Sequence, residues 1–241
     1  MGKHFFSTAE MDGQMAVRFS DAKAHHIINV LRMRLGDTVI LCDGKGMDFT
    51  ARLIDSNRSE VVFTLHDPIH STTELPFSIT LFQGIPKGDK FDWIIEKAVE
   101  IGVNRIVPVF TEHSSVKVKD AFKKRARYER VATAAAAQCM RGVLPIVDEA
   151  VGFDESLKRD LPEISLVAHE KESINTVKAT LRHCTPTDIG VWVGPEGGFS
   201  TREIDLLSYR NIASVSLGSR ILRCETAGLV ALSQIIYEWY L

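Results

Sequence analysis

The sequence has no segment suited to crossing or anchoring in a membrane. No apolar run reaches the roughly 18 residues that a spanning helix needs, and the first residues, MGKHFFSTAEMDG, lack the apolar core of a signal peptide. The serine or threonine of a myristoylation signal is also missing from its usual place after the N-terminal glycine. We therefore expect a cytoplasmic protein without a membrane partner.

Cysteine is scarce, and its spacing excludes the common metal and redox motifs. The four cysteines lie far apart in the chain, form no C-x-x-C pair and have no histidine at zinc-finger spacing. They are Cys42, Cys139, Cys184 and Cys224. We expect reduced thiols that pack as small apolar side chains, with no metal site and no covalent catalysis.

Two nucleotide-binding motifs are absent as well. The sequence has no G-x-G-x-x-G after a first strand and no G-x-x-x-x-G-K-[ST], which disfavours dinucleotide enzymes and nucleoside triphosphatases. Net charge is −2, so the chain as a whole is not a polyanion binder. Positive charge is nevertheless concentrated in 117-KVKDAFKKRARYER-130, which could contact RNA phosphates or could be a solvated helix face.

The first part of the chain predicts a small β-rich domain, residues 1–70. One helix is expected over residues 21–35, from an N-cap at Ser20 to Gly36. Alternating apolar residues separated by turn signals predict strands around it, at 3–7, 37–43, 47–55 and 60–67. The polar, proline-bracketed segment 68–76 is the expected linker.

The remainder, residues 74–241, predicts an α/β domain. Apolar runs predict strands at 77–83, 105–110, 164–169, 189–194 and 212–218. Helices are expected between them, at 88–102, about 120–140, 173–183, from Ser200, and at 225–240. Strands that alternate with helices imply parallel crossovers, and hence a parallel sheet covered on both faces.

Two glycine-bearing turns follow late strands of this domain. They are 194-GPEGG-198 and 217-LGSRILRCET-226, with Ala168-His169-Glu170 as a third strand end. Ligands of open parallel sheets bind at the carboxyl ends of the strands, and glycine lets the backbone approach a flat ligand closely. Ser200 and Glu203 fit a capping box, so GPEGG could also be no more than a tight turn before a helix.

Taken together, these motifs resemble those of the SPOUT methyltransferases, and more specifically the bacterial 16S rRNA uridine-N3 methyltransferases, the RsmE family. The matching pieces occur in family order along nearly the whole chain: KHFF, 87-KGDKFDWIIEKAVEIGV-103, 138-QCMRGVLP-145, GPEGGFS and LGSRILRCETA. The resemblance implies a C-terminal SPOUT domain with a deep trefoil knot, an N-terminal PUA-like RNA-binding domain and a homodimer joined through the final helices.

The resemblance also implies S-adenosyl-L-methionine as the cofactor, bound in the knot loops. The implied cofactor contacts are Leu166, His169, Gly194, Pro195, Glu196, Gly197, Gly198, Leu217, Gly218, Ser219, Ile221 and Leu222. Backbone groups would read the adenine edge, with leucine and isoleucine side chains on either side of the ring.

Methylation of uridine N3 requires loss of a weakly acidic proton and stabilisation of charge on the uracil oxygens. Glu170 is the first candidate for the base, ahead of Glu225 and Glu196, since a carboxylate can accept that proton. Arg223 ranks first for the cationic role, followed by Arg220 and then Arg141 from a partner subunit.

The expected partner is single-stranded or looped ribosomal RNA, or the small ribosomal subunit, with the target base flipped out. The RNA-binding candidates are Lys3, His4, Arg18, Arg32, Arg34, Lys123, Lys124, Arg127 and Arg141. Two alternatives stay open: a SPOUT enzyme acting on another rRNA or tRNA base, and a non-catalytic RNA-binding protein of ribosome assembly.

Overall fold

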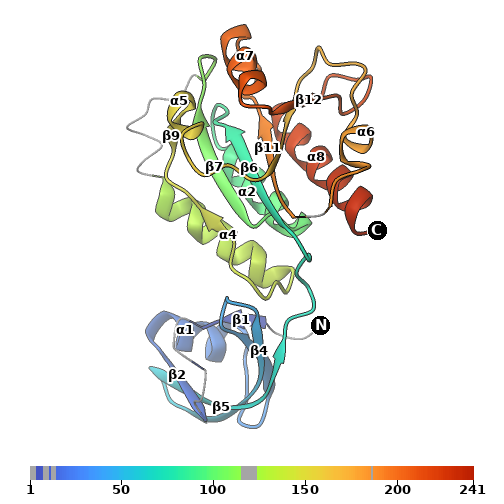
Figure 1. Cartoon of the computed structure of the whole chain (residues 1–241). Coiled ribbons are helices and arrows are strands. Elements are labelled where there is room, and N and C mark those ends of the chain that lie inside the picture. Colours follow the sequence, from blue (N-terminus) through green and yellow to red (C-terminus); the bar gives the residue numbers. More distant parts are fainter. Residues whose placement is uncertain (1–3, 8–10, 12–14, 115–123, 186) are drawn as a thin grey trace. The chain divides into compact units, whose positions relative to one another are not determined.

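The chain forms two compact units in the computed structural model, which describes residues 4–7, 11, 15–114, 124–185 and 187–241 (Figure 1). The first unit comprises Met1–Glu74 together with Ala136–Leu144, and the second comprises Leu75–Ala135 and Pro145–Leu241. Within the described residues, no helix combines the length and apolar character needed to cross a membrane.

The first unit is built on a five-stranded sheet in the order β1-β3-β4-β5-β2. The strands are β1 (His4–Phe6), β2 (Ala16–Ser20), β3 (Thr38–Cys42), β4 (Met47–Ser56) and β5 (Glu60–His70). β1 pairs with β3 in parallel, and the other pairs are antiparallel. Because alternate residues face the same side, Leu41, Phe49 and Phe63 meet in one apolar core. The prediction of a β-rich fold here is confirmed, although β2 was not predicted.

The helix predicted over 21–35 ends earlier than expected. α1 (Asp21–His25) continues as a single π-helical stretch, η1 (His26–Val30), and the backbone N–H of Leu31 bonds to the carbonyl of His26 at 3.0 Å. Arg32 then adopts φ 52°, which stops the helix. The β-branched residues of 26-HIINV-30 have poor helix propensity, which is consistent with this early end.

The linker predicted from residue 68 also begins later, because β5 runs on to His70. The β4–β5 register shifts between Thr50↔His66 and Asp48↔Ile69, so Asp67 and Pro68 of β5 lie opposite Phe49 alone and the one extra residue forms a bulge. Pro68 lies in this bulge, where its missing N–H removes no ladder hydrogen bond.

A buried ion pair fixes the 136–144 segment within the first unit. The Glu74 carboxylate accepts hydrogen bonds from the Arg141 guanidinium at 2.7 Å and from the backbone N–H groups of Gly142 and Val143 at 2.9 and 3.1 Å. The Arg141 side chain is only 5% exposed. One carboxylate thus holds a charged side chain and two backbone donors in place.

The second unit is built on a seven-stranded sheet in which every pairing is parallel, as predicted. The strand order is β12-β10-β11-β6-β7-β8, with β9 also paired to β7. The strands are β6 (Ser78–Gly84), β7 (Arg105–Phe110), β8 (Ile146–Val147), β9 (Val151–Gly152), β10 (Ile164–Ala168), β11 (Asp188–Val193) and β12 (Ala213–Val215). β8 and β9 escaped prediction because two residues carry no detectable periodicity.

Helices connect these strands and cover the sheet (Figure 1). They are α2 (Lys90–Ile101), α4 (Arg125–Gln138), α5 (Phe153–Ser156), α6 (Val177–Leu181), α7 (Thr201–Tyr209) and α8 (Cys224–Trp239). α2 buries Phe91, Ile94, Ile95 and Ala98, whose spacing places them on one face of the helix. α6 is shorter than predicted because its N-cap is Thr176, whose hydroxyl accepts from the N–H of Ala179. The short helix α5 was not predicted.

We expect Glu74→Gln to destabilise the first unit, since it removes the carboxylate charge that pairs with the buried Arg141 guanidinium. The free energy of unfolding in urea should fall by about 3 kcal/mol, as for other broken buried pairs. Glu60→Gln is the matched control, because Glu60 pairs with an Arg18 side chain that is 71% exposed, and it should cost less than about 1 kcal/mol. Equal losses in the two variants would contradict a structural role for the Glu74–Arg141 pair.

Candidate functional site

Three strand ends form one edge of the second sheet, and at this edge the backbone packs on itself. A Cβ atom at Gly84 would lie 2.6 Å from the backbone nitrogen of Pro195, and one at Gly194 would lie 2.8 Å from the carbonyl carbon of Gly198. Gly198 also has φ 67°, a conformation that favours glycine. The GPEGG turn therefore needs glycine for close backbone approach.

The helix after this turn begins as predicted. Ser200 and Glu203 form a reciprocal capping box: the Ser200 hydroxyl accepts from the N–H of Glu203, whose carboxylate accepts from the N–H of Ser200 at 2.8 Å. The same buried carboxylate accepts from the N–H of Glu112 at 2.9 Å. His113 next to it donates from Nδ1 to the Gly197 carbonyl at 2.8 Å. The GPEGG turn is thus held by the capping box that follows it and by the hydrogen bond from His113.

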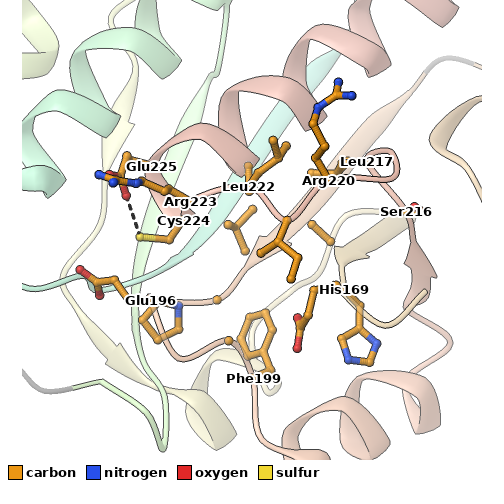
Figure 2. Close-up of a pocket in the computed structure, with 18 of the residues that line it drawn as sticks. His169, Glu196, Phe199, Ser216, Leu217, Arg220, Leu222, Arg223, Cys224 and Glu225 are labelled. Carbon is orange, nitrogen blue, oxygen red and sulfur yellow. Dashed lines mark hydrogen bonds between the residues drawn. The ribbon is translucent and has the colours of Figure 1, made fainter. Parts of the chain in front are cut away.

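The turn forms one wall of a cavity of about 470 Å³ (Figure 2). Residues 168–170 with Glu172 form the second wall, and 216–225 with Ala227 form the third, with Lys90 at the margin. Its volume lies within the range of pockets for drug-sized ligands. Apolar side chains of Leu217, Ile221 and Leu222 contribute to the lining, beside backbone groups of the glycine turn.

The third wall is extended backbone held at its two ends. The N–H of Ser216 bonds to the carbonyl of Asn175 at 2.7 Å, which ties this wall to the β10–α6 connection. Gly218 has φ 126°, and Arg223 is the extended N-cap residue of α8. Between them, Arg220 and Ile221 are exposed, with Ile221 at 85%. Residues 217–223 belong to no strand, and their side chains and backbone line the cavity.

Charged groups gather at one side of the cavity. Lys90 Nζ lies 3.1 Å from a Glu196 oxygen and 3.5 Å from a Glu225 oxygen, and Figure 2 shows Glu196, Cys224 and Glu225 together here. Burial acts to raise the pKa of Glu196, but its backbone hydrogen bonds and Lys90 outweigh burial and lower that pKa. The pKa of Glu225 is lowered in the same way. Both carboxylates are therefore ionised at neutral pH and weak as bases.

Cys224 lies beside this group but is not an activated thiol. Burial, with a hydrogen bond to Glu225 at 3.2 Å, raises the pKa of the Cys224 thiol to about 12. A protonated thiol is a poor nucleophile. The geometry agrees with the expectation that this cysteine has no covalent role.

Two glutamates shape the wall after β10. The exposed Glu170 carboxylate lies against the GPEGG turn: a Cβ atom at Gly198 would be 3.5 Å from its oxygens. Glu172 accepts from the backbone N–H groups of Ser173, Ile174 and Asn175 at 2.8–3.0 Å. These bonds lower the pKa of Glu172 and close the turn that carries Asn175 to Ser216.

Comparison with known proteins identifies the family. The family model for an RNA methyltransferase domain matches residues 73–236, and the model for an RNA methyltransferase PUA domain matches residues 19–65. The chain belongs to this RNA methyltransferase family. The family assignment made from the GPEGGFS and LGSRILRCETA motifs is thereby confirmed.

Relatives of this methyltransferase carry a more specific name. The chain is 33% identical to the ribosomal RNA small subunit methyltransferase E of Bacillus subtilis, over 99% of this chain and 97% of that protein. It is 32% identical to the protein of the same name from Rickettsia conorii, over 90% of this chain and 87% of that one. A Neisseria gonorrhoeae enzyme of this name, solved bound to S-adenosyl methionine, matches with 31% identity and a TM-score of 0.90, over 99% of this chain and 98% of that one.

The structure of the methyltransferase brings most of the predicted site residues together. All three predicted catalytic residues and eleven of the twelve predicted cofactor contacts line the cavity: His169, Glu170, Gly194, Pro195, Glu196, Gly197, Gly198, Leu217, Gly218, Ser219, Arg220, Ile221, Leu222 and Arg223. Leu166 is the exception. It is 1% exposed in the middle of β10 and does not line the cavity.

The residues predicted to contact RNA differ in their exposure to solvent. Arg32 and Arg34 are exposed, and Arg18 and Arg127 are exposed but paired with Glu60 and Asp92.

His4 and Arg141 are buried instead, with side chains 4% and 5% exposed, so each would have to leave its present partners to reach a phosphate. Lys124 is partly buried, while Lys3, Lys123 and residues 117–123 of the basic cluster lie outside the described residues.

Sequence reasoning did not identify Lys90, Glu172, Phe199 or Cys224 as cavity residues. Lys90 belongs to the KGDKFDW segment, over a hundred residues from the glycine turns, and only the β6–β11 pairing brings it to this edge. A lysine between an apolar strand and an amphipathic helix gives no distinctive signal by itself.

We expect Glu172→Gln to weaken the acid dependence of stability. Because the folded-state pKa of Glu172 is lowered, its contribution is present above the unfolded pKa, near 4.5, and is lost as the pH falls through the lower folded value. The difference in Tm between wild type and variant should be constant above about pH 6 and shrink below about pH 4.5. Glu163→Gln, on an exposed side chain outside the cavity, is the control. A Tm difference that does not change with pH would contradict this role.

Proposed function

We propose that this chain transfers a methyl group from S-adenosyl-L-methionine to N3 of a uridine in small-subunit ribosomal RNA. The observation that carries the proposal is the cavity between the GPEGG turn and the LGSRIL segment, in a chain whose relatives are named for small-subunit rRNA methylation. The Neisseria gonorrhoeae relative bound to S-adenosyl methionine supports the choice of cofactor.

The residues of the cavity suit such a cofactor. Glycine has no side chain, so the backbone N–H and C=O groups of the glycine turns can approach a ligand closely. An adenine edge needs such close backbone donors and acceptors. Leu217, Ile221 and Leu222 supply apolar surface for a flat ring, and carboxylates supply negative charge for a cationic sulfur. When bound, the cofactor supplies an electrophilic methyl group.

The side chains of the cavity support the remaining steps. We assign proton removal from uridine N3 to Glu170, because its carboxylate is exposed at the cavity and is not engaged by Lys90, unlike Glu196 and Glu225. We assign stabilisation of the negative charge on the uracil oxygens to Arg223, with Arg220 as a second cation. Both guanidinium groups are exposed at the edge of the cavity, where an extruded base could reach them.

The finer features of the fold belong to the same proposal. We infer that residues 74–241 form a SPOUT domain with a trefoil knot, because the chain crosses from β11 past β10 to β12 and then returns as α8 against β11, α2 and α6. We infer a homodimer through α8, whose groove includes Leu229, Val230 and a Tyr237 that is 68% exposed. Residues 1–70 would then supply RNA contacts through Arg18, Arg32 and Arg34.

Nucleoside analysis of ribosomal RNA tests the proposed substrate. Small-subunit rRNA from cells lacking this protein should lack one N3-methyluridine, and a plasmid copy should restore it. If another methylated base is lost instead, uridine N3 is not the target and that other base is the substrate. An unchanged set of modified nucleosides would favour a non-catalytic role in ribosome assembly.

We expect Gly197→Val to abolish binding of S-adenosyl-L-methionine. A Cβ atom at this position would lie 2.9 Å from the Cβ of His113, so the GPEGG turn must move. Calorimetry should show at least a hundredfold weaker affinity. Gly152→Val is the control, since a Cβ there meets no atom within 4 Å. If His113→Gly, which removes the colliding Cβ, restores no affinity in the Gly197→Val background, the collision is not the cause.

We expect Arg223→Ala to lower turnover by about a hundredfold or more, the range for loss of one stabilising donor. Affinity for the cofactor should change little, because Arg223 is assigned to the uracil oxygens. Single-turnover methylation of rRNA, with calorimetry of cofactor binding, separates the two effects. Arg182→Ala, an exposed arginine outside the cavity, is the control. Turnover near the wild-type value would remove Arg223 from the mechanism.

A further inference from the structure

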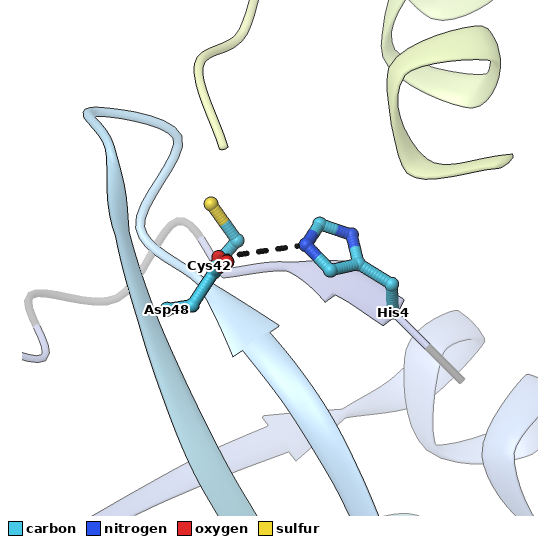
Figure 3. A group of neighbouring side chains, drawn as sticks. All are labelled: His4, Cys42 and Asp48. Carbon is cyan, nitrogen blue, oxygen red and sulfur yellow. Dashed lines mark ion pairs between the residues drawn. The ribbon is translucent and has the colours of Figure 1, made fainter. Parts of the chain in front are cut away.

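A second cluster of reactive side chains lies in the first unit, within Met1–Glu74 and Ala136–Leu144. His4, Cys42 and Asp48 each direct one donor atom toward the others, and all three atoms lie within 4.8 Å of one another (Figure 3). They come from β1, β3 and β4, so His4 converges here with Cys42 and Asp48, from which it is 38 or more positions away in sequence. Nothing in the proposed methyl transfer uses them.

The sheet register explains this convergence. Phe6 pairs with Cys42 in the parallel β1–β3 ladder, and Cys42 pairs with Asp48 in the antiparallel β3–β4 ladder. His4 is two residues from Phe6, so its side chain shares the face of Cys42 and Asp48. Leu41 and Phe49, the adjacent pair, face the apolar core on the other side.

This outer face of the sheet is covered within the same unit. The Cys42 sulfur lies 3.0 Å from the carbonyl oxygen of Gly142, and the N–H of Leu144 bonds to the carbonyl of Gly44 at 3.0 Å. Cys42 is consequently 0% exposed and the His4 side chain 4% exposed. The cluster is a closed, polar site and not a set of surface residues.

The polar atoms of this site lack the partners that burial demands. Among the described residues, both ring nitrogens of His4 and Oδ1 of Asp48 are buried without a hydrogen-bond partner, although His4 Nε2 lies 3.5 Å from Asp48 Oδ1. Buried polar atoms in native proteins are almost always satisfied. Two of these orphaned atoms, beside a thiol, face a common point, and a cation at that point would satisfy them.

We propose that His4, Cys42 and Asp48 bind a zinc ion, with the Gly142 carbonyl or a water as the fourth ligand. Nitrogen, sulfur and carboxylate oxygen are the donors that zinc prefers in tetrahedral sites. Ideal zinc bonds place neighbouring donors about 3.3–3.7 Å apart, so the three side chains need to move inward by only about 1 Å. Sulfur and nitrogen donors disfavour calcium and magnesium.

Charge balance favours a divalent cation at this site. A Cys42 thiolate, an Asp48 carboxylate and a neutral His4 together carry two negative charges, which Zn²⁺ neutralises. A cysteine binds zinc as the thiolate, so binding of the cation displaces one proton from the sulfur to solvent. The sulfur, nitrogen and oxygen ligands keep their oxidation states.

The ion would hold the N-terminal strand. Among the described residues, β1 is an edge strand of three residues that pairs with β3 alone. Coordination through His4 would fix this strand to β3 and β4 at one point. The wide separation of His4 from Cys42 and Asp48 explains why cysteine spacing alone predicted no metal site.

Zinc content tests the proposal in the full-length protein after removal of any histidine tag. Elemental analysis after dialysis should give about one zinc per chain in wild type and less than about a tenth of that in His4→Ala and Cys42→Ser. His66→Ala and Cys184→Ser are the matched controls, being a histidine and a cysteine elsewhere in the chain, and should keep the metal. Zinc that survives Cys42→Ser, or that is lost with Cys184→Ser, would overturn the assignment.

A second measurement decides the matter even if the variants do not fold. Metal-stripped wild-type protein titrated with Co²⁺ should develop a thiolate-to-cobalt charge-transfer band that zinc abolishes. Zinc at a hundred times its Kd should raise Tm by about 5 °C or more. Absence of the band together with an unchanged Tm would overturn the proposal and leave the cluster as a buried polar group without a metal.

Discussion

Close contact between backbone segments at the ends of β6 and β11 is the constraint on which the site depends. Gly84 packs against Pro195, and Gly194 packs against Gly198, so closely that a Cβ atom on Gly84 or Gly194 would collide with the neighbouring backbone. The buried amide of Gln83 adds hydrogen bonds to the carbonyls of Gly84 and Gly194 at 3.1 and 3.4 Å. These contacts position the GPEGG turn where it leaves the sheet, and there it forms a wall of the cavity.

Hydrogen bonds also position the other two walls of the cavity. Glu172 closes the turn after β10, and Asn175 then binds the backbone of Ser216, so two walls are coupled through one short connection. Lys90 forms ion pairs with both Glu196 and Glu225 at the far side. This leaves Glu170 as the exposed carboxylate of the cavity that carries no lysine partner among the described residues, which is why the proposed mechanism gives it the proton.

Much of the fold could be predicted from periodicity and turn residues. The alternation of strands and helices after residue 77 predicted a parallel sheet, and the register confirms it. The errors occurred where local signals conflict with tertiary contacts. Helix propensity did not anticipate the π-helical end at Val30, and Pro68 suggested a linker where a bulge lets β5 continue.

The sequence by itself determined the family, the two glycine turns and most of the residues that line the cavity, because each lies in a short motif whose meaning is local. The tertiary structure decided which side chains those motifs meet. It brought Lys90 to Glu196 and Glu225, and it buried Arg141 against Glu74. It also gathered His4, Cys42 and Asp48 at one point of a sheet. Such contacts depend on strand register and on crossover connections. These bring together residues that are distant in the chain, so no local pattern in the sequence predicts them.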